Sequence, residues 1–331
     1  MNKIRYSSID TIRFILACCI VMIHNPYGYT KNPLLDVVLR MAVPIFFMIS
    51  GYFNVTSDDK AAAKNIAAVK RTLKLVVIAN VLYFFWGIYM NMYSLKSFLG
   101  YVFWPGNIFN FVVFNESPVK AHLWFLSALL MCYAIMYVSA KLKLGQKIYL
   151  LIFSGLFVMI LCEFDNVLIG RDIYVIYYRN CWFFGIAYFL VGRWLRENED
   201  KVKEFAGKLT LWKVIAVTVI SFGIALGMRR FTGANEMYTV MLPLEVILMS
   251  LAVKNTSFGQ NTVFEKLGRE YSLPLYILHP IVCDIIFRLS RMYGWSNNVM
   301  SYIVVPVTII IMLITLKGYF TVISIRRSSK N

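Results

Sequence analysis

The sequence is poor in charged residues, and poorest in acidic ones. Charged residues make up 15% of its 331 positions, whereas soluble domains contain about 25%. The 34 lysines and arginines are twice as many as the 17 aspartates and glutamates, and hydrophobic residues reach 59%. Because no polar stretch is long enough to build a soluble domain, we expect one integral membrane domain over residues 1–331 and no soluble domain.

Metal-binding and nucleic-acid-binding patterns are also missing. The six cysteines fall in or beside apolar runs, and none has the spacing of metal ligands, so we interpret them as small packing residues. The net charge of +17 is spread over many short loops without a basic domain or interleaved aromatic residues. We therefore expect no bound metal and no nucleic-acid partner.

Ten apolar runs have roughly the length needed to cross a membrane, which is about 17–25 residues. They predict an all-α polytopic transmembrane bundle of about ten spans. If the N-terminus is cytoplasmic, 23 lysines and arginines lie inside and 10 outside. The positive-inside rule then places both termini in the cytoplasm. The runs cover residues 9–26, 34–55, 73–93, 121–140, 148–165, 179–196, 211–229, 237–254, 272–290 and 299–320.

Two segments between the spans have distinct patterns. Segment 94–120 is too apolar for a solvated loop and too short to cross, which favours an interfacial or re-entrant helix. Segment 56–72 begins with a capping signature and continues as an alanine-rich helix. That helix is predicted to bring Lys70, Arg71 and Lys74 to the cytoplasmic membrane surface.

Arg13 and His24 are ionisable residues within the first apolar run. Eleven helical steps come to about three turns, so both side chains point to one face, about 16 Å apart. Asp10 lies near the same face. Ionisable groups in membrane segments usually face a wet cavity or the protein interior. Since imidazole titrates near neutral pH, His24 is the preferred general base, with a structural role as the alternative.

Near the inner end of this span, a group of cations is expected to hold an anionic donor. Arg13, Arg71 and Lys74, together with Asp10, are the predicted donor-binding residues, because guanidinium and ammonium groups bind phosphates. The alternative is an Asp10–Arg13 helix pair with ordinary surface anchoring by the other cations.

Near the outer side, polar residues from several spans are predicted to converge with His24 on one cavity. Glu116 would orient or replace His24 and is therefore a third predicted catalytic residue, after His24 and Arg13. For His122, a role as a helix cap or interface anchor is the alternative. The predicted acceptor-binding residues are Arg40, His122, Arg179, Asn180, Tyr276 and His279.

Two spans contain prolines. Pro44 and Gly51 in the second span predict a kink and close helix packing. In the ninth span, Pro274 and Pro280 free backbone carbonyls, which are tolerated only inside protein or at a wet cavity. Tyr276 and His279 are three residues apart in that span and share a face.

Five segments stand in chain order: Asp10-x-x-Arg13 with His24, Val43–Tyr52, His122–Leu126, Arg179–Gly185 and Tyr271–Pro280. Together they resemble the acyltransferase-3 family of integral membrane acyltransferases. The resemblance implies transfer of an acyl group, usually acetyl, from cytoplasmic acetyl-CoA to a hydroxyl or amine of a cell-surface glycan or other acceptor outside. It also implies that Arg13 and His24 are essential.

The resulting prediction is an acyl-CoA-dependent O-acyltransferase, multi-pass in a bacterial-type cell membrane, with no tightly bound cofactor. Its expected partners are the lipid bilayer, an acyl-CoA, and a cell-envelope glycan or small acceptor. The sequence does not decide whether the protein forms a homodimer.

Val43–Tyr52, His122–Leu126 and Asn235–Pro243 are also similar to the membrane domains of vancomycin-resistance serine racemases. That branch of the family is associated with amino-acid uptake. An amino-acid transporter or binding domain is therefore the alternative function, with Arg179, Glu116 and the break in the ninth span as ligands. A third interpretation is a glycan-binding or flipping scaffold. Whether the chain stands alone or is a piece of a longer protein is left open.

Overall fold

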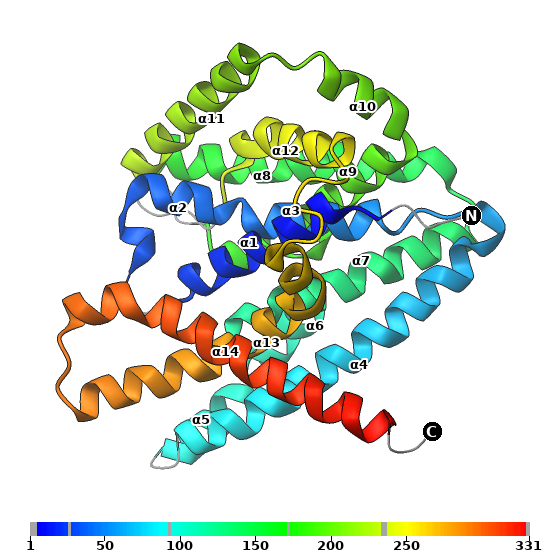
Figure 1. Ribbon diagram of the computed structural model, residues 1–331. Coiled ribbons are helices and arrows are strands. Elements are labelled where there is room, and N and C mark those ends of the chain that lie inside the picture. The colour runs from blue at the N-terminus through cyan, green and yellow to red at the C-terminus, as the bar shows by residue number, and fades with distance from the viewer. Residues whose placement is uncertain (1–4, 26–27, 92–93, 171–172, 233–236, 329–331) are drawn as a thin grey trace. The chain divides into compact units, whose positions relative to one another are not determined.

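A computed structural model describes residues 5–25, 28–91, 94–170, 173–232 and 237–328 (Figure 1). This part of the chain is helical and contains no β-strand, which confirms the predicted all-α membrane bundle. Asn235 and Glu236, which open one of the segments similar to racemases, lie outside the described residues. The α-helices are α1 (Ser7–Ile23), α2 (Pro33–Arg40), α3 (Ala42–Tyr52), α4 (Asp58–Met90), α5 (Leu95–Val102), α6 (Pro105–Phe114), α7 (Trp124–Lys141), α8 (Leu150–Leu168), α9 (Ile186–Glu197), α10 (Glu199–Gly207), α11 (Leu211–Thr232), α12 (Leu242–Lys254), α13 (Val263–Met292) and α14 (Asn297–Ser328).

Each of the ten apolar runs forms at least one helix. Among the described residues, seven helical segments are long and apolar enough to cross a membrane, or eight if α5 and α6 count as one bent span. The runs at 9–26, 179–196 and 237–254 form α1, α9 and α12, of 17, 12 and 13 residues, which are not among these seven segments. The number of spans and the location of the termini stay predictions.

The segments between the spans also became helices. α5 and α6 meet at 47°, the geometry of a broken span or a re-entrant loop. Pro105 opens α6, where its missing N–H costs no helical hydrogen bond. The alanine-rich segment and the third apolar run form one continuous helix, α4, of 33 residues. Ser57 stands at its N-cap, but its side chain makes no capping hydrogen bond.

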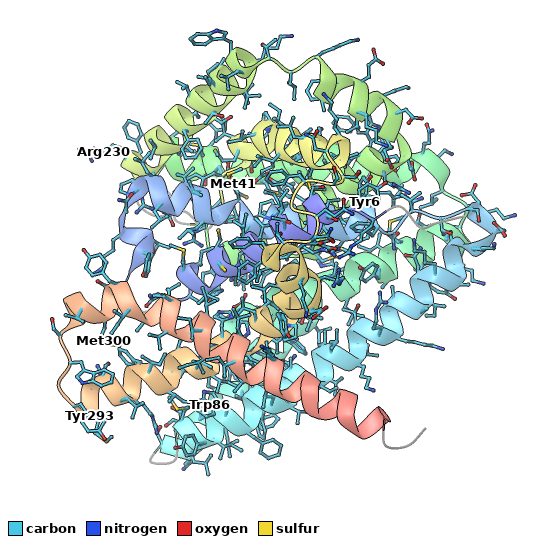
Figure 2. The ribbon with its side chains drawn as sticks, in the orientation of Figure 1. Tyr6, Met41, Trp86, Arg230, Tyr293 and Met300 are labelled. Carbon is cyan, nitrogen blue, oxygen red and sulfur yellow. The ribbon has the colours of Figure 1, made fainter. Side chains whose placement is uncertain are left out.

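The chain divides into two compact units, and the first comprises Met1–Ala42 and Leu251–Asn331. Within it, α1 packs along α13, and α13 packs against α14. At Gly268 of α13 a Cβ atom would lie 1.7 Å from the backbone oxygen of Asp10, so the two backbones touch. Met300, labelled in Figure 2, joins Cys283, Ile286 and Val304 in the apolar core between α13 and α14.

The second unit comprises Val43–Ser250. In it, α4 packs against α7 and α8 packs against α9. α3 and α9 cross through two glycines: a Cβ at Gly51 would lie 1.8 Å from the oxygen of Phe189, and one at Gly192 would lie 1.9 Å from that of Met48. The sequence predicted close packing at Gly51. Gly192 on α9 also lacks a side chain, so the backbones of both helices can approach each other.

Candidate functional site

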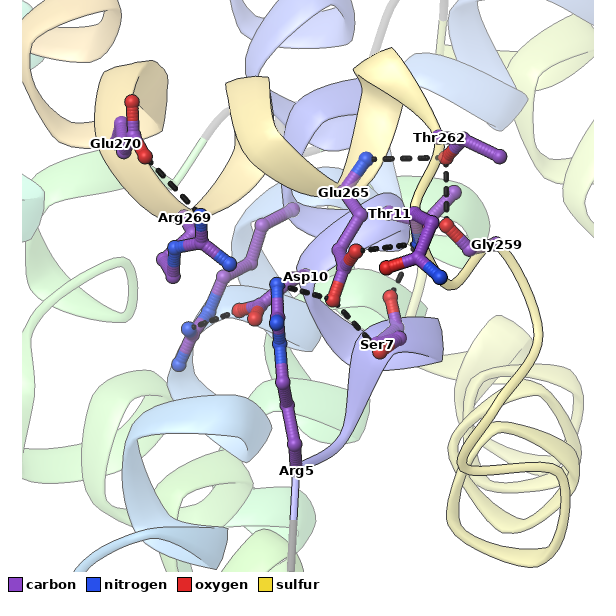
Figure 3. Close-up of polar contacts among 11 residues, drawn as sticks. Arg5, Ser7, Asp10, Thr11, Gly259, Thr262, Glu265, Arg269 and Glu270 are labelled. Atoms are coloured by element: carbon purple, nitrogen blue, oxygen red, sulfur yellow. Dashed lines mark hydrogen bonds and ion pairs between the residues drawn. The ribbon is translucent and has the colours of Figure 1, made fainter.

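At the start of α1, polar side chains tie this helix to the start of α13 (Figure 3). Asp10 accepts a hydrogen bond of 2.8 Å from the Arg13 guanidinium. Arg5 pairs with Glu265 at 2.5 Å, and the Ser7 hydroxyl donates to the same carboxylate at 2.6 Å. The Asp10–Arg13 helix pair that the sequence offered as an alternative is therefore present. The Arg13 side chain is 28% exposed, whereas that of Asp10 is 12% exposed.

Sequence reasoning missed Glu265, although a recognisable pattern marks it. Thr262 is the N-cap of α13, and its hydroxyl accepts from the backbone N–H of Glu265 at 3.3 Å. Thr262-x-x-Glu265 matches a capping box. The Glu265 carboxylate accepts from the backbone N–H of Asn261 at 2.8 Å, and also binds Arg5 and Ser7 of the other segment. Glu265, in the first turn of α13, thus holds the start of α1 in place.

At the other end of α1, two predicted site residues come together. His24 is the C-cap residue of α1, and it is exposed. Its ring centroid lies 5.5 Å from that of His279 in α13, which is fully buried. The sequence selected both histidines but did not predict their proximity, because they are 255 positions apart along the chain. Their roles as general base and acceptor-binding residue stay predictions.

Two other predicted acceptor-binding residues lie in the first unit. Arg40, the last residue of α2, pairs with Asp36 of the same helix at 3.1 Å, and Asp36 is fully buried. Tyr276 is also buried, and its backbone oxygen contacts the ring of His279. The Arg40 pair therefore gives this residue a structural contact within α2.

In the second unit, Glu116 and Arg179 form an ion pair of 3.1 Å. The Arg179 guanidinium also lies over the ring of Trp124, 5.1 Å from its centroid. His122 is buried and its ring meets that of Tyr83 edge-on at 4.9 Å. The structure thus brings Glu116, Trp124 and Arg179 of this unit together, and a cavity at the outer side stays a prediction.

Asn180 and Asn115 shape the backbone at this cluster. The Asn180 side chain accepts from the N–H groups of Trp182 and Phe183 and donates to the oxygens of residues 176 and 177. It therefore caps a π-helix at Cys181–Gly185, a geometry that often occurs at functional sites. Asn115, which the sequence analysis did not select, adopts φ 66° and accepts from the N–H of Cys181 at 2.9 Å.

The predicted cavities draw on both units. Arg71 and Lys74 are exposed on α4 in the second unit, whereas Asp10 and Arg13 belong to the first. Of the outer residues, His24, Arg40, Tyr276 and His279 belong to the first unit and Glu116, His122, Arg179 and Asn180 to the second. Convergence on a single donor site and a single acceptor site stays a prediction.

The second unit also contains a cavity of about 340 Å³ that none of the predicted residues lines. Its walls include Asn65, Ser139, Lys143 and Arg193. Asn54 donates to Asn65 at 2.8 Å, and Arg193 reaches the side chain of Asn54 at 3.4 Å. Among the described residues, no group of three or more potential ligands could hold a metal ion.

The chain is similar in sequence to known proteins. The chain is 27% identical to an amino-acid racemase of Enterococcus faecalis over 325 residues. The match covers 91% of the chain but 43% of that protein, so the chain spans less than half the length of this relative. No solved structure matches. The sequence model of the family described as "Acyltransferase domain" matches residues 6–317, nearly the whole chain, and the protein therefore belongs to this acyltransferase family.

Proposed function

We propose that this protein is a membrane acyltransferase that moves an acetyl group from cytoplasmic acetyl-CoA to a hydroxyl of a cell-envelope glycan or similar acceptor on the outer side. The observation that carries the proposal is family membership over residues 6–317, combined with two chemically distinct groups on α1, Arg13 in its first half and His24 at its C-cap. Arg13, partly exposed, lies toward the predicted inner end, and His24 ends the helix on the predicted outer side.

The spacing of these groups suits one extended donor. Eleven helical steps separate Arg13 from His24, about 16 Å along the axis. Asp10 holds the Arg13 guanidinium through one nitrogen, and a guanidinium has five N–H donors with which it can also bind a donor phosphate. An extended pantetheine arm is long enough to carry the thioester from there toward His24.

The chemistry requires a base at the acceptor hydroxyl. A nitrogen of His24 would take the hydroxyl proton while the oxygen attacks the thioester carbonyl. The new carbon–oxygen bond forms, the carbon–sulfur bond breaks, and the proton on His24 passes to the departing thiolate of CoA. Glu116, which forms an ion pair with Arg179 in the second unit, stays a predicted catalytic residue.

Calorimetry tests donor binding directly. Acetyl-CoA titrated into the protein in lipid nanodiscs should bind in the micromolar range. Arg13→Ala should weaken this binding by about tenfold or more, because hydrogen bonds to charged groups contribute about 1.5–3 kcal/mol. Lys208→Ala, which removes a cation from an exposed pair with Glu204 in the second unit, is the charge-matched control and should not change binding. No heat at millimolar acetyl-CoA would reject this donor.

His24→Ala separates binding from chemistry. This variant should bind acetyl-CoA like the wild type and fail to release CoA in the presence of an envelope polysaccharide acceptor. If His24→Ala transfers acetyl groups at a near wild-type rate, the assignment of His24 as the base is wrong.

A second candidate function is amino-acid transport or binding. The similarity to the Enterococcus faecalis racemase over 91% of the chain favours it. The Glu116–Arg179 pair of the second unit would then contact the charged groups of the amino acid. Uptake of labelled serine into proteoliposomes without acetyl-CoA would support transport, and uptake that Arg179→Gln leaves unchanged would exclude this site.

A further inference from the structure

Pro280 changes the hydrogen bonding of the residue before it. Proline has no backbone N–H, so the oxygen of Tyr276, four residues earlier in α13, lacks its usual helical donor. The Nδ1 atom of His279 lies 2.9 Å from this oxygen and 3.1 Å from the oxygen of Leu275. Because a carbonyl oxygen can only accept, the hydrogen of this contact belongs to Nδ1.

The tautomer of His279 follows from this contact. A neutral imidazole has one N–H and one acceptor nitrogen, and the bond made by one nitrogen sets the state of the other. With the hydrogen on Nδ1, Nε2 is the acceptor nitrogen. The His279 side chain is fully buried, so the surrounding protein holds the ring in this orientation.

His24 is within reach of this ring. The two ring centroids are 5.5 Å apart and the ring planes differ by 32°. An N–H···N hydrogen bond of about 3 Å between ring edges corresponds to roughly 5 Å between centroids. His24 is exposed at the end of α1, so rotation about its side-chain bonds is less restricted than that of His279.

We propose that His279 is a positioning residue that fixes the tautomer of His24. A turn of the exposed His24 ring brings one of its nitrogens to Nε2 of His279, which then accepts a hydrogen bond from it. The other His24 nitrogen is left unprotonated and directed at the acceptor hydroxyl. When His24 takes the hydroxyl proton, the resulting imidazolium continues to donate to His279, and His279 itself gains no proton. This role rests on the proposed function of His24 as the base.

Nitrogen NMR of the protein labelled with ¹⁵N-histidine tests the pair without any substrate. The chain has three histidines, so the His122→Gln and His24→Gln variants assign the spectrum. We expect His279 to show a protonated Nδ1 and an unprotonated Nε2, and His24 to show one dominant tautomer. A His279 ring protonated at Nε2 would overturn the proposal.

Two variants test the coupling between the rings. His279→Phe keeps a ring without nitrogens and should turn the His24 signals into those of a tautomer mixture. A folded His279→Phe protein whose His24 signals match the wild type would overturn the positioning role. In transfer assays the same variant should lower kcat and leave the KM for acetyl-CoA unchanged, whereas a general loss of folding would lower the amount of active protein without this split.

The two prolines of α13 provide a matched comparison. Pro280→Ala restores a backbone N–H for the oxygen of Tyr276, which competes with Nδ1 and should raise the population of the other His279 tautomer. Pro274→Ala restores a donor for the oxygen of Glu270 and should leave the His279 signals unchanged. Equal effects of the two variants on the His279 signals would refute the claim that Pro280 sets the tautomer of His279. Because these readouts need no donor, their failure is distinct from failure of the proposed function.

Discussion

The contact between α1 and α13 in the first unit leads to a quantitative prediction for Gly268. A Cβ atom at this position would lie 1.7 Å from the oxygen of Asp10, 2.7 Å from its carbonyl carbon and 3.1 Å from the nitrogen of Phe14. All three atoms belong to the backbone, so no side-chain rotation can make room. In Gly268→Ala the two helices must therefore move apart by more than 1 Å.

Two opposing effects set the size of the change. Overpacking of a well-packed contact costs about 1–3 kcal/mol, and occasionally more. Replacing glycine by alanine within a helix returns up to about 1 kcal/mol of helix propensity. Because the obstacle is rigid backbone, we place the overpacking cost at the upper end, and expect Gly268→Ala to lower the free energy of unfolding by about 2 kcal/mol.

A matched glycine separates packing from propensity. Gly223 lies within α11, and a Cβ atom built there meets nothing within 4 Å. Gly223→Ala should therefore leave stability unchanged or raise it by less than about 1 kcal/mol. Unfolding of both variants by SDS in mixed micelles, followed by circular dichroism, gives the comparison. If Gly268→Ala is as stable as Gly223→Ala, α1 and α13 do not pack backbone to backbone.

Three further changes test contacts elsewhere, each by the same SDS unfolding assay. Glu163 accepts from the N–H and the hydroxyl of Thr239, so Glu163→Ala should cost about 1–3 kcal/mol and Thr239→Val about 1 kcal/mol; equal costs would show that the backbone bond contributes nothing. Asn180→Ala removes two capping bonds and two bonds to the oxygens of residues 176 and 177, and should cost about 2 kcal/mol or more; Asn180→Asp keeps the capping oxygen but cannot donate, and should restore only part of this loss. Arg40→Met leaves the buried Asp36 without its guanidinium partner and should cost about 3 kcal/mol, and the double variant with Asp36→Asn should recover most of this loss.

Local patterns in the sequence were sufficient for the helices and for single residues of the candidate site. Apolar runs of about twenty residues predicted the membrane bundle because backbone groups in lipid must be paired within their own segment. The rarity of ionisable groups in such runs drew attention to Arg13 and His24. The same patterns did not show where helices break. The predicted helix at 56–72 and the apolar run at 73–93 form one continuous helix, α4, because no proline or glycine interrupts it until Gly87.

What the sequence by itself determined is therefore the helical membrane class, the family resemblance and the identity of the polar residues within the spans. Only the tertiary structure showed that His24 meets His279, that Glu116 pairs with Arg179, and that Glu265 binds the start of α1. The physical reason is distance along the chain. Hydropathy and helix periodicity act over neighbouring residues, whereas these pairs form only when helices far apart in sequence pack, and packing depends on the shapes of both partners at once.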